Sequence, residues 1–525
     1  MMFGRFKYKI SHTTFCLVYP LALFAISNAI NLEKLMKWFA VKDGLDVIGF
    51  SSYLLTALSL FISFFVLIAH RRTVKPFAIL LVALSAAATY FIAKYNVAVD
   101  SSMIMNVVNT DSTEASGLLS FQMLPYVLFL IVVPTVVILA GEITFEPGGQ
   151  YLFASAKLFA VALVISIGSL YLNHNAINRA LTASAKYVIY SLVPINVIQG
   201  SLNATYKTLK PHFASKKQVD IRGSVASKED IVVVLAIGES ARRKNFSLYG
   251  YTGKLTNPIL GQVSGLHLLN GIAAKGSTLY ALPEILEKSD IKLAEIVSKA
   301  GVPTACLVNY TLYDNCDAVG EVKVSNCKHG SDCYDEDVIP LLKENLRSYS
   351  SSQRFVVLHL GGGSHGPVYK DRYPPSFQKF QPMCSDADVA SRCTLEELYN
   401  SYDNSVLYTD YVLGGIVNTL DASGVPYVLI YLSDHGESLM EDGRIFHGVP
   451  PGISLPPEQA DIPLIVKSSV PLSIVPRSEG YSQPDVFDTI LDLLSIDTPH
   501  FDKRGSFIKK THPPAAHGSP AIQGR

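Results

Sequence analysis

The residues of this sequence that are best suited to chemistry are carboxylates and imidazoles that follow short apolar runs. Each run is rich in β-branched residues and predicts a buried strand. The polar residues follow three such runs: Glu239 after Ile231–Ile237, His365 after Phe355–Leu360, and Asp434 and His435 after Tyr427–Leu432, with His447 twelve residues after His435. Carboxylate oxygens and imidazole nitrogens are typical zinc ligands, so the pattern predicts a metal site.

A sheet must bring these residues together, and the sequence predicts one. A fourth apolar run at Pro303–Val308 completes a set whose near-continuous apolar character is typical of parallel strands covered on both faces. Leu279–Ala300 and Leu395–Leu420 are long enough to be crossover helices, which predicts an α/β sandwich. Ligands of such sheets bind beyond the carboxyl ends of the strands. A single Glu or His there is more often a helix-terminal charge or a surface residue, but the joint pattern is specific.

The first third of the chain predicts a membrane domain, because five apolar stretches are each long enough to span a bilayer. They are Thr13–Ile30, Val47–His70, Pro76–Tyr95, Phe121–Ile143 and Phe153–Leu172. Basic residues before the first span and between the second and third predict a cytoplasmic N-terminus, which places everything after Leu172 outside. The formal net charge is zero and the chain has no basic patch, so no nucleic-acid partner is expected.

These patterns predict four segments. Residues 1–172 form the transmembrane domain, and residues 173–228 form connector helices on the membrane surface and a linker. Residues 229–510 form the catalytic domain, and the Pro- and Gly-containing tail at 511–525 is expected to be disordered.

Six of the seven cysteines lie between Cys306 and Cys393, on the outer side of the membrane in this topology. The close spacing of Cys327 with Cys333 and of Cys384 with Cys393 predicts two disulfides, and Cys306–Cys316 is a further candidate. Reduced, buried thiols are the alternative.

Four longer runs carry a resemblance to a known family. They are Gly238–Pro258, His365–Pro374, Tyr402–Leu413 and Ser433–Gly448 (SDHGESLMEDGRIFHG). These runs resemble the lipid A and lipooligosaccharide phosphoethanolamine transferases, which include the mobile colistin-resistance enzymes and belong to the alkaline phosphatase/sulfatase superfamily. The likeness covers nearly the whole chain. It implies a zinc-dependent enzyme of the Gram-negative inner membrane with a periplasmic sulfatase-like domain. It also implies phosphatidylethanolamine as donor and lipid A or another envelope glycan as acceptor; a monomer is expected.

The resemblance also implies roles for individual residues. Thr278 matches the nucleophile of the family, although its position at the start of a helix would otherwise indicate a helix cap, as for Ser277. Zinc is then held by Glu239, Thr278, Asp434 and His435, and His365 or His447 protonates the leaving oxygen or binds phosphate. Ser240 is not expected to be a nucleophile.

Asn106, Thr110 and Glu114 are spaced to lie on one face of a helix. A solvated polar face explains the spacing equally well. The resemblance favours a role in binding the ethanolamine head group of the donor.

The sequence departs from the family in two places. Ala274 and Glu284 occupy positions where the family commonly has two disulfide-bonded cysteines around its nucleophile, so this loop must be held by other contacts. The segment Asn309–Asp314 lacks the lysine that the family often places near the substrate phosphate. Phosphoglycerol transferases and phosphodiesterases of the same superfamily remain alternatives, as does a membrane scaffold without activity.

Overall fold

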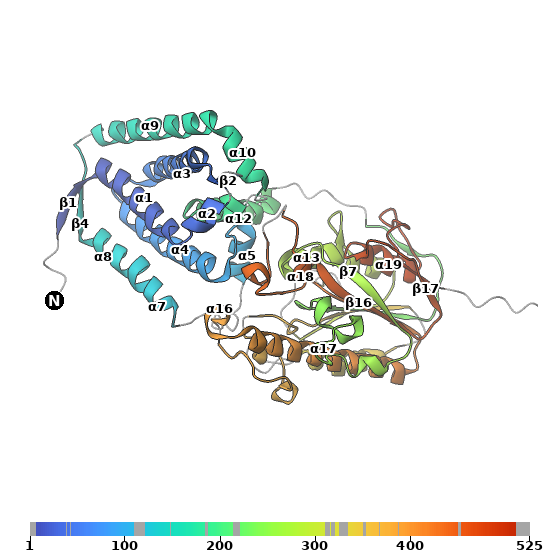
Figure 1. Cartoon of the computed structure of the whole chain (residues 1–525). Coiled ribbons are helices and arrows are strands. Elements are labelled where there is room, and N and C mark those ends of the chain that lie inside the picture. Colours follow the sequence, from blue (N-terminus) through green and yellow to red (C-terminus); the bar gives the residue numbers. More distant parts are fainter. Residues whose placement is uncertain are drawn as a thin grey trace, which may run out of the picture. The chain divides into compact units, whose positions relative to one another are not determined.

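The protein divides into two compact units, which are described separately (Figure 1). The first, the helical unit, comprises Met1–Lys216, Asp442–Arg444 and Gly448–Ser454, and the second, the sheet unit, comprises the rest of the chain. The computed structural model describes residues 7–37, 39–41, 44–109, 121–147, 149–183, 187–213, 221–309, 316, 321–324, 334–349, 353–366, 368–386, 388–449 and 453–510. Thr110, Glu114, Cys327, Cys333 and the tail at 511–525 lie outside these residues.

The helical unit contains five helices that are long and apolar enough to cross a bilayer, which confirms the predicted number of spans. They are α1 (His12–Ala29), α3 (Val47–Ile68), α4 (Val74–Tyr95), a continuous helix made of α7 (Met123–Tyr126), η1 (Val127–Val132) and α8 (Val133–Ala140), and α9 (Gln150–Leu172). Phe15, Phe61 and Phe65 pack in the core between them. Asp46 begins α3, because its side chain accepts a hydrogen bond from the Gly49 amide at 2.8 Å.

Shorter elements complete the helical unit. Strands β1 (Tyr8–Ser11) and β4 (Gly141–Thr144) pair in parallel. The remaining elements are α2 (Leu32–Lys37), the pair β2 (Ala40–Val41) and β3 (Gly44–Leu45), α5 (Ser101–Asn109), α10 (His174–Ala183), α11 (Tyr187–Tyr190) and α12 (Ile195–Phe213). The described part of 173–228 contains α10, α11 and α12, and the placement of this connector on the membrane surface stays a prediction.

The sheet unit is built on eight strands in the order β11-β10-β12-β6-β13-β16-β7-β18. The four predicted strands are β6 (Val232–Gly238), β10 (Thr304–Val308), β12 (Arg354–His359) and β13 (Tyr427–Ser433). They are neighbours and run parallel, as predicted. The others are β7 (Leu266–Ile272), β11 (Glu321–Val324), β16 (Asp461–Ser468) and β18 (Tyr481–Ser482).

The sheet is not parallel throughout, because one strand runs against the others. Strand β16 is antiparallel to both of its neighbours, β13 and β7, so the sheet is mixed. Neither β16 nor β7 was predicted; β7 carries polar residues such as His267 and Asn270 and is only partly buried. Such a strand lacks the continuous apolar run that marked the other four.

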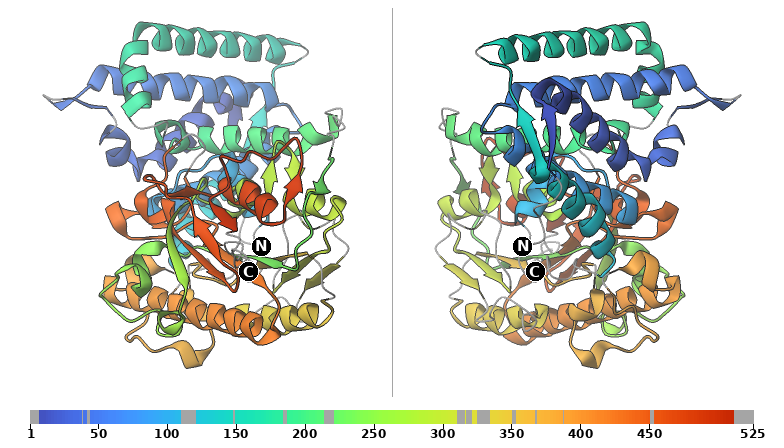
Figure 2. Two further views of the ribbon diagram at one scale, coloured as in Figure 1. Left: turned by 90° about the vertical axis from the view of Figure 1, so that its right-hand side faces the viewer. Right: turned by 90° about the vertical axis from the view of Figure 1, so that its left-hand side faces the viewer.

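Helices cover both faces of this sheet (Figures 1 and 2). On one face α13 (Thr278–Leu286), α14 (Leu293–Lys299) and α19 (Asp485–Leu493) pack against the strands and form a continuous apolar core. On the other lies α17 (Leu395–Ser423), which packs against α15 (Val338–Arg347).

Two helical predictions for this unit have different outcomes. The helix predicted at Leu395–Leu420 is confirmed as α17, which begins with a capping box of Thr394 and Glu397. The helix predicted at Leu279–Ala300 is wrong as a single element. A small hairpin of β8 (Glu287–Lys288) and β9 (Ile291–Lys292) interrupts it, because both residues of its turn, Ser289 and Asp290, take positive φ values that end a helix.

Two of the predicted disulfides lie within the described residues, and both are formed. They join Cys306 to Cys316 and Cys384 to Cys393. Cys16, in α1, is buried and is not in a disulfide.

A thiol-labelling experiment tests these pairings in the protein itself. Alkylation of the denatured, unreduced protein should modify Cys16 and spare Cys306, Cys316, Cys384 and Cys393, because a disulfide sulfur offers no thiolate. Reduction before alkylation should expose all of them. Peptide mass spectrometry reads the result, and modification of Cys384 or Cys393 without reduction would contradict the pairing.

Candidate active site

The polar residues that follow β6, β12 and β13 meet at one edge of the sheet. These three strands are adjacent and parallel, and the register pairs both His359 and Leu432 with Ile237. The residues after each strand therefore emerge at the same height, beyond the carboxyl ends. The structure brings Glu239, Asp434 and His435 together there, as the sequence predicted, and adds Thr278 from the start of α13.

The Thr278 hydroxyl is directed at this cluster. It donates a hydrogen bond to Glu239 Oε2 at 2.9 Å and lies 3.4 Å from His435 Nε2. The residue that precedes α13 is Ser277, and its side chain makes no capping hydrogen bond. Thr278 is therefore the first helical residue, with its hydroxyl engaged by a carboxylate rather than by the helix backbone.

The donor atoms around Thr278 fit a divalent metal. Ligand atoms of Glu239, Asp434 and His435 all lie within 4.8 Å of one another, and all three side chains are buried. His435 Nε2 lies 3.2 Å from Asp434 Oδ2 and 3.6 Å from Glu239 Oε1. No described residue donates a hydrogen bond to Asp434 Oδ2, so a buried anionic oxygen points into the cluster with no donor of its own. Two carboxylates, an imidazole and a hydroxyl are a ligand set that suits zinc.

The pKa of His435 also indicates that the cluster attracts cations. Burial lowers the pKa of its imidazole, but the carboxylates of Asp434 and Glu239 outweigh this effect and raise the pKa above its ordinary value. The cluster thus attracts positive charge, as a cation site must.

Ser240 orients both carboxylates, which the sequence analysis missed. Its hydroxyl donates to Glu239 Oε1 at 2.7 Å, and its backbone N–H donates to Asp434 Oδ1 at 3.0 Å. Its φ of 55° lies in the left-handed region, which is unusual for serine and is held by these two hydrogen bonds. Ser240 was considered only as a possible nucleophile, and its hydrogen bonds to the two carboxylates were not predicted.

Three imidazoles line the site, and the hydrogen-bond partners of two of them indicate the tautomer. Nδ1 of His435 lies 3.0 Å from the Gly436 carbonyl, and Nδ1 of His447 lies 2.7 Å from Glu437 Oε2. Both partners are acceptors, so we assign the ring hydrogen to Nδ1 in these two rings, which leaves Nε2 as the basic atom. Nδ1 of His365 contacts both the Gly366 carbonyl, an acceptor, and the Arg372 guanidinium, a donor. The His447 ring lies between the other two, with centroids 4.8 Å from His365 and 4.2 Å from His435.

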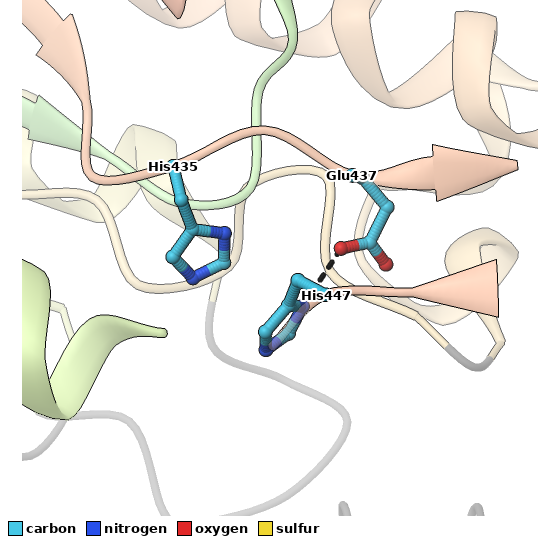
Figure 3. Close-up of side chains that lie close together, drawn as sticks. All are labelled: His435, Glu437 and His447. Atoms are coloured by element: carbon cyan, nitrogen blue, oxygen red, sulfur yellow. Dashed lines mark hydrogen bonds and ion pairs between the residues drawn. The ribbon is translucent and has the colours of Figure 1, made fainter. Parts of the chain in front are cut away.

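Glu437 connects His447 to the frame of the site (Figure 3). It is fully buried, and besides His447 it accepts a hydrogen bond from the Tyr369 hydroxyl at 2.9 Å. Burial raises the pKa of Glu437 to about 7. Glu437, His435 and His447 form a second group whose ligand atoms lie within 4.8 Å. The sequence analysis missed this role, although Glu437 stands two residues after His435 within the quoted motif.

Buried polar groups hold the loop that carries His365 in place. Asp335 accepts hydrogen bonds from the amides of Gly362 at 2.8 Å and Gly363 at 2.9 Å. Gly363 has a φ of 35°, and a Cβ there would lie 2.3 Å from the Glu239 carbonyl oxygen, so only glycine fits. Burial, and then the neighbouring Arg372 guanidinium, lower the pKa of His365 to about 4.

The residues expected to bind the donor are only partly described. Asn106 lies in α5 of the helical unit. Thr110 and Glu114 lie outside the described residues, so their common helical face stays a prediction.

Comparison with known proteins gives the family. Residues 231–496 match the sulfatase family model, and residues 57–209 match the model described as phosphoethanolamine transferase EptA/EptB. The chain is 32% identical to phosphoethanolamine transferase EptA of Helicobacter pylori, over 79% of this chain and 80% of that one. It is 29% identical to EptA of Escherichia coli K12, over 93% and 95% of the two chains.

A solved structure agrees with these relatives. The integral membrane protein lipooligosaccharide phosphoethanolamine transferase A of Neisseria meningitidis superposes with a TM-score of 0.79 at 25% identity, covering 94% of this chain and 97% of that one. The likeness therefore includes the five apolar helices as well as the sulfatase-like sheet. The chain belongs to the EptA family of phosphoethanolamine transferases, which are enzymes of the bacterial inner membrane with the catalytic domain in the periplasm.

Proposed function

We propose that this enzyme moves phosphoethanolamine from phosphatidylethanolamine to lipid A or lipooligosaccharide through a covalent intermediate on Thr278. The observation that carries the proposal is the position of the Thr278 hydroxyl. It lies at the N-terminus of α13, 2.9 Å from Glu239 Oε2 and 3.4 Å from His435 Nε2. A hydroxyl beside buried metal-ligand groups is an activated nucleophile by position.

Glu239, Thr278, Asp434 and His435 would hold a zinc ion. When bound, zinc lowers the pKa of a coordinated hydroxyl and neutralises charge on a transferring phosphoryl group. The supporting observations are the ligand set itself and Asp434 Oδ2, to which no described residue donates a hydrogen bond. Ser240 keeps both carboxylates in place for this purpose.

In the first half-reaction, Thr278 Oγ1 gives up its proton and forms a bond to the phosphorus of the donor. The bond from phosphorus to the diacylglycerol oxygen breaks, and that oxygen takes up a proton. Thr278 opens α13, so the positive end of the helix dipole would stabilise the charge of the phosphoryl group. His365 or His447 supplies the proton or binds a phosphoryl oxygen. The Glu437 carboxylate favours His447 as the proton carrier, because it can stabilise the imidazolium form.

In the second half-reaction, an oxygen of the acceptor attacks the phosphothreonine. The phosphorus bond to Thr278 Oγ1 breaks, and the hydroxyl is restored by a proton. Lipid A or lipooligosaccharide is the proposed acceptor because related enzymes are named for these lipids. Donor and acceptor both reside in the membrane, which agrees with a membrane-anchored enzyme.

The remaining assignments follow from the same proposal. Asn106, Thr110 and Glu114 bind the donor head group, with Glu114 pairing with its ammonium. The enzyme acts as a monomer with a membrane domain at 1–172, a connector at 173–228 and a catalytic domain at 229–510.

Lipid analysis of cells tests the proposed function directly. Lipid A from bacteria that express the protein should carry phosphoethanolamine, and lipid A from matched cells expressing the Thr278→Ala variant should not. The added ammonium should also reduce binding of cationic peptides to the cells, because it lowers the negative surface charge. Mass spectrometry of lipid A, core sugars and periplasmic glucans reads the result. A phosphoglycerol increment would favour the alternative transferase, and unmodified glycans in all fractions would reject transfer.

A further inference from the structure

Gln483 lies between β18 and α19 and is almost wholly buried, with 1% of its surface exposed. Its Oε1 accepts a hydrogen bond from the backbone N–H of Ala274 at 2.8 Å. Its Nε2 donates to the carbonyl oxygens of Asp434 at 2.5 Å and Ser433 at 3.2 Å. One side chain therefore joins the loop that leads into Thr278 to the turn that carries Asp434.

The chemistry of this contact requires an amide. One end of the side chain meets an N–H donor and the other meets two carbonyl acceptors, and only an amide offers an acceptor and two donors in this arrangement. The two carbonyl contacts are buried and the Ala274 contact is part-buried, so loss of the amide removes a partner from each of three backbone groups that water reaches poorly.

The segment 273–278, which leads into Thr278, makes few other contacts that could fix its position. Ala274 and Glu284 occupy the positions where the resembling family commonly has a disulfide. In this chain Lys275 and Glu284 form an ion pair at 3.1 Å instead, but both side chains are partly exposed. An exposed pair of this kind contributes little, because water screens it and ordering the side chains opposes it. The Ala273 N–H also donates to the Ala460 carbonyl at 2.8 Å, and the carbonyl of the adjacent Gln459 accepts from the Gly436 N–H at 2.9 Å. This second route to the Asp434 turn is indirect, whereas the Gln483 side chain bridges the two segments by itself.

We infer that Gln483 is a positioning residue that sets the spacing between the Thr278 hydroxyl and the Asp434–His435 turn. The inference rests on the proposed role of Thr278. The Gln483 side chain bonds the backbone of Ala274, Ser433 and Asp434, so it acts on both segments through their backbone. A nucleophile that shifts by about 1 Å can lose on the order of 10²-fold in rate, so this spacing matters for turnover.

The variant that tests the inference is Gln483→Met, which keeps the length of the side chain and removes all three hydrogen bonds. The matched control is Gln353→Met. Gln353 is 5% exposed and donates to the carbonyls of Ser227 at 3.2 Å and Leu494 at 2.9 Å. Neither acceptor belongs to a residue of the candidate active site. Both variants lose buried amide bonds of the same kind.

The full-length enzyme in detergent is assayed with phosphatidylethanolamine, and zinc content and apparent melting temperature are measured alongside. We expect Gln483→Met to lower kcat by roughly 10²-fold with KM for the donor unchanged. Gln353→Met should lower the melting temperature with kcat of the folded enzyme unchanged. Equal losses of stability and an unchanged kcat in both variants would overturn the inference and leave Gln483 a structural residue.

Hydrogen exchange separates this inference from the proposed function. In the zinc-loaded protein, amides of the segment 273–278 should exchange faster in Gln483→Met than in wild type or Gln353→Met. If the wild-type protein transfers nothing, the proposed function fails, but faster exchange in this segment would still support the tie. Unchanged exchange there would reject the tie whatever the activity.

Discussion

Replacement of Thr278 by alanine should abolish phosphoethanolamine transfer and leave the fold intact. Oγ1 is the atom on which the proposed intermediate forms, so its removal should lower turnover by about 10⁴-fold or more, as loss of a nucleophile does in other covalent enzymes. The stability cost should be only about 1 kcal/mol, because the hydroxyl donates one hydrogen bond, to Glu239, and its other contact, with His435 Nε2, is long at 3.4 Å. Release of diacylglycerol from phosphatidylethanolamine by the purified protein measures turnover, and thermal unfolding measures stability.

Two companion variants give this experiment its contrast. Thr278→Ser keeps the hydroxyl and should retain measurable turnover. Thr419→Ala also removes one hydroxyl, which donates to the Gly415 carbonyl within α17 at 2.8 Å. This variant should leave turnover unchanged. Incubation of wild type with donor alone should place phosphoethanolamine on the peptide that contains Thr278. An adduct on Ser240 or Ser277 would show that the assignment within this loop is wrong, and transfer without any adduct would exclude the two-step mechanism.

The four adjacent parallel strands and the centre of the site could be predicted because their signals are local. Each of β6 and β13 is a run of buried apolar residues followed at once by its polar residue, and the two strands are neighbours, so Glu239 and Asp434 meet at one edge. The five apolar helices are equally local signals of length and composition.

The parts that the sequence missed depend on partners far away along the chain. The direction of β16 depends on pairing with both β13 and β7. The role of Gln483 depends on its hydrogen bonds with Ala274 and Asp434, which are far from it in the sequence. Glu437 stood within the quoted motif, but its role follows from Tyr369 and His447, whose contacts no spacing rule gives. Residues that support a site are therefore harder to infer than those that form it.

Replacement of Asp434 by asparagine should separate metal binding from folding. The amide oxygen can still accept from the N–H groups of Ser240 and His435, which now bond Oδ1 at 3.0 Å and 2.7 Å. The change replaces Oδ2, the oxygen to which no described residue donates, with an uncharged NH₂. Zinc affinity should fall by at least about 100-fold, the upper end of the cost of losing an outer-shell partner, and transfer should stop.

The stability of the Asp434→Asn variant should change in opposite directions with and without metal. With chelator, the variant should be at least as stable as wild type, because it loses a buried carboxylate oxygen that accepts no hydrogen bond from a described residue and lies near the Glu239 carboxylate. With zinc at 100 times its wild-type Kd, wild type should gain about 2.7 kcal/mol and the variant almost nothing. The matched control is Asp410→Asn, since Asp410 is buried and accepts from the amides of Ile259 and Leu260 at 2.7 Å and 3.0 Å. It should lose stability in both conditions and keep the full zinc-induced gain. If zinc stabilised Asp434→Asn as much as it stabilises wild type, Asp434 would not be a metal ligand.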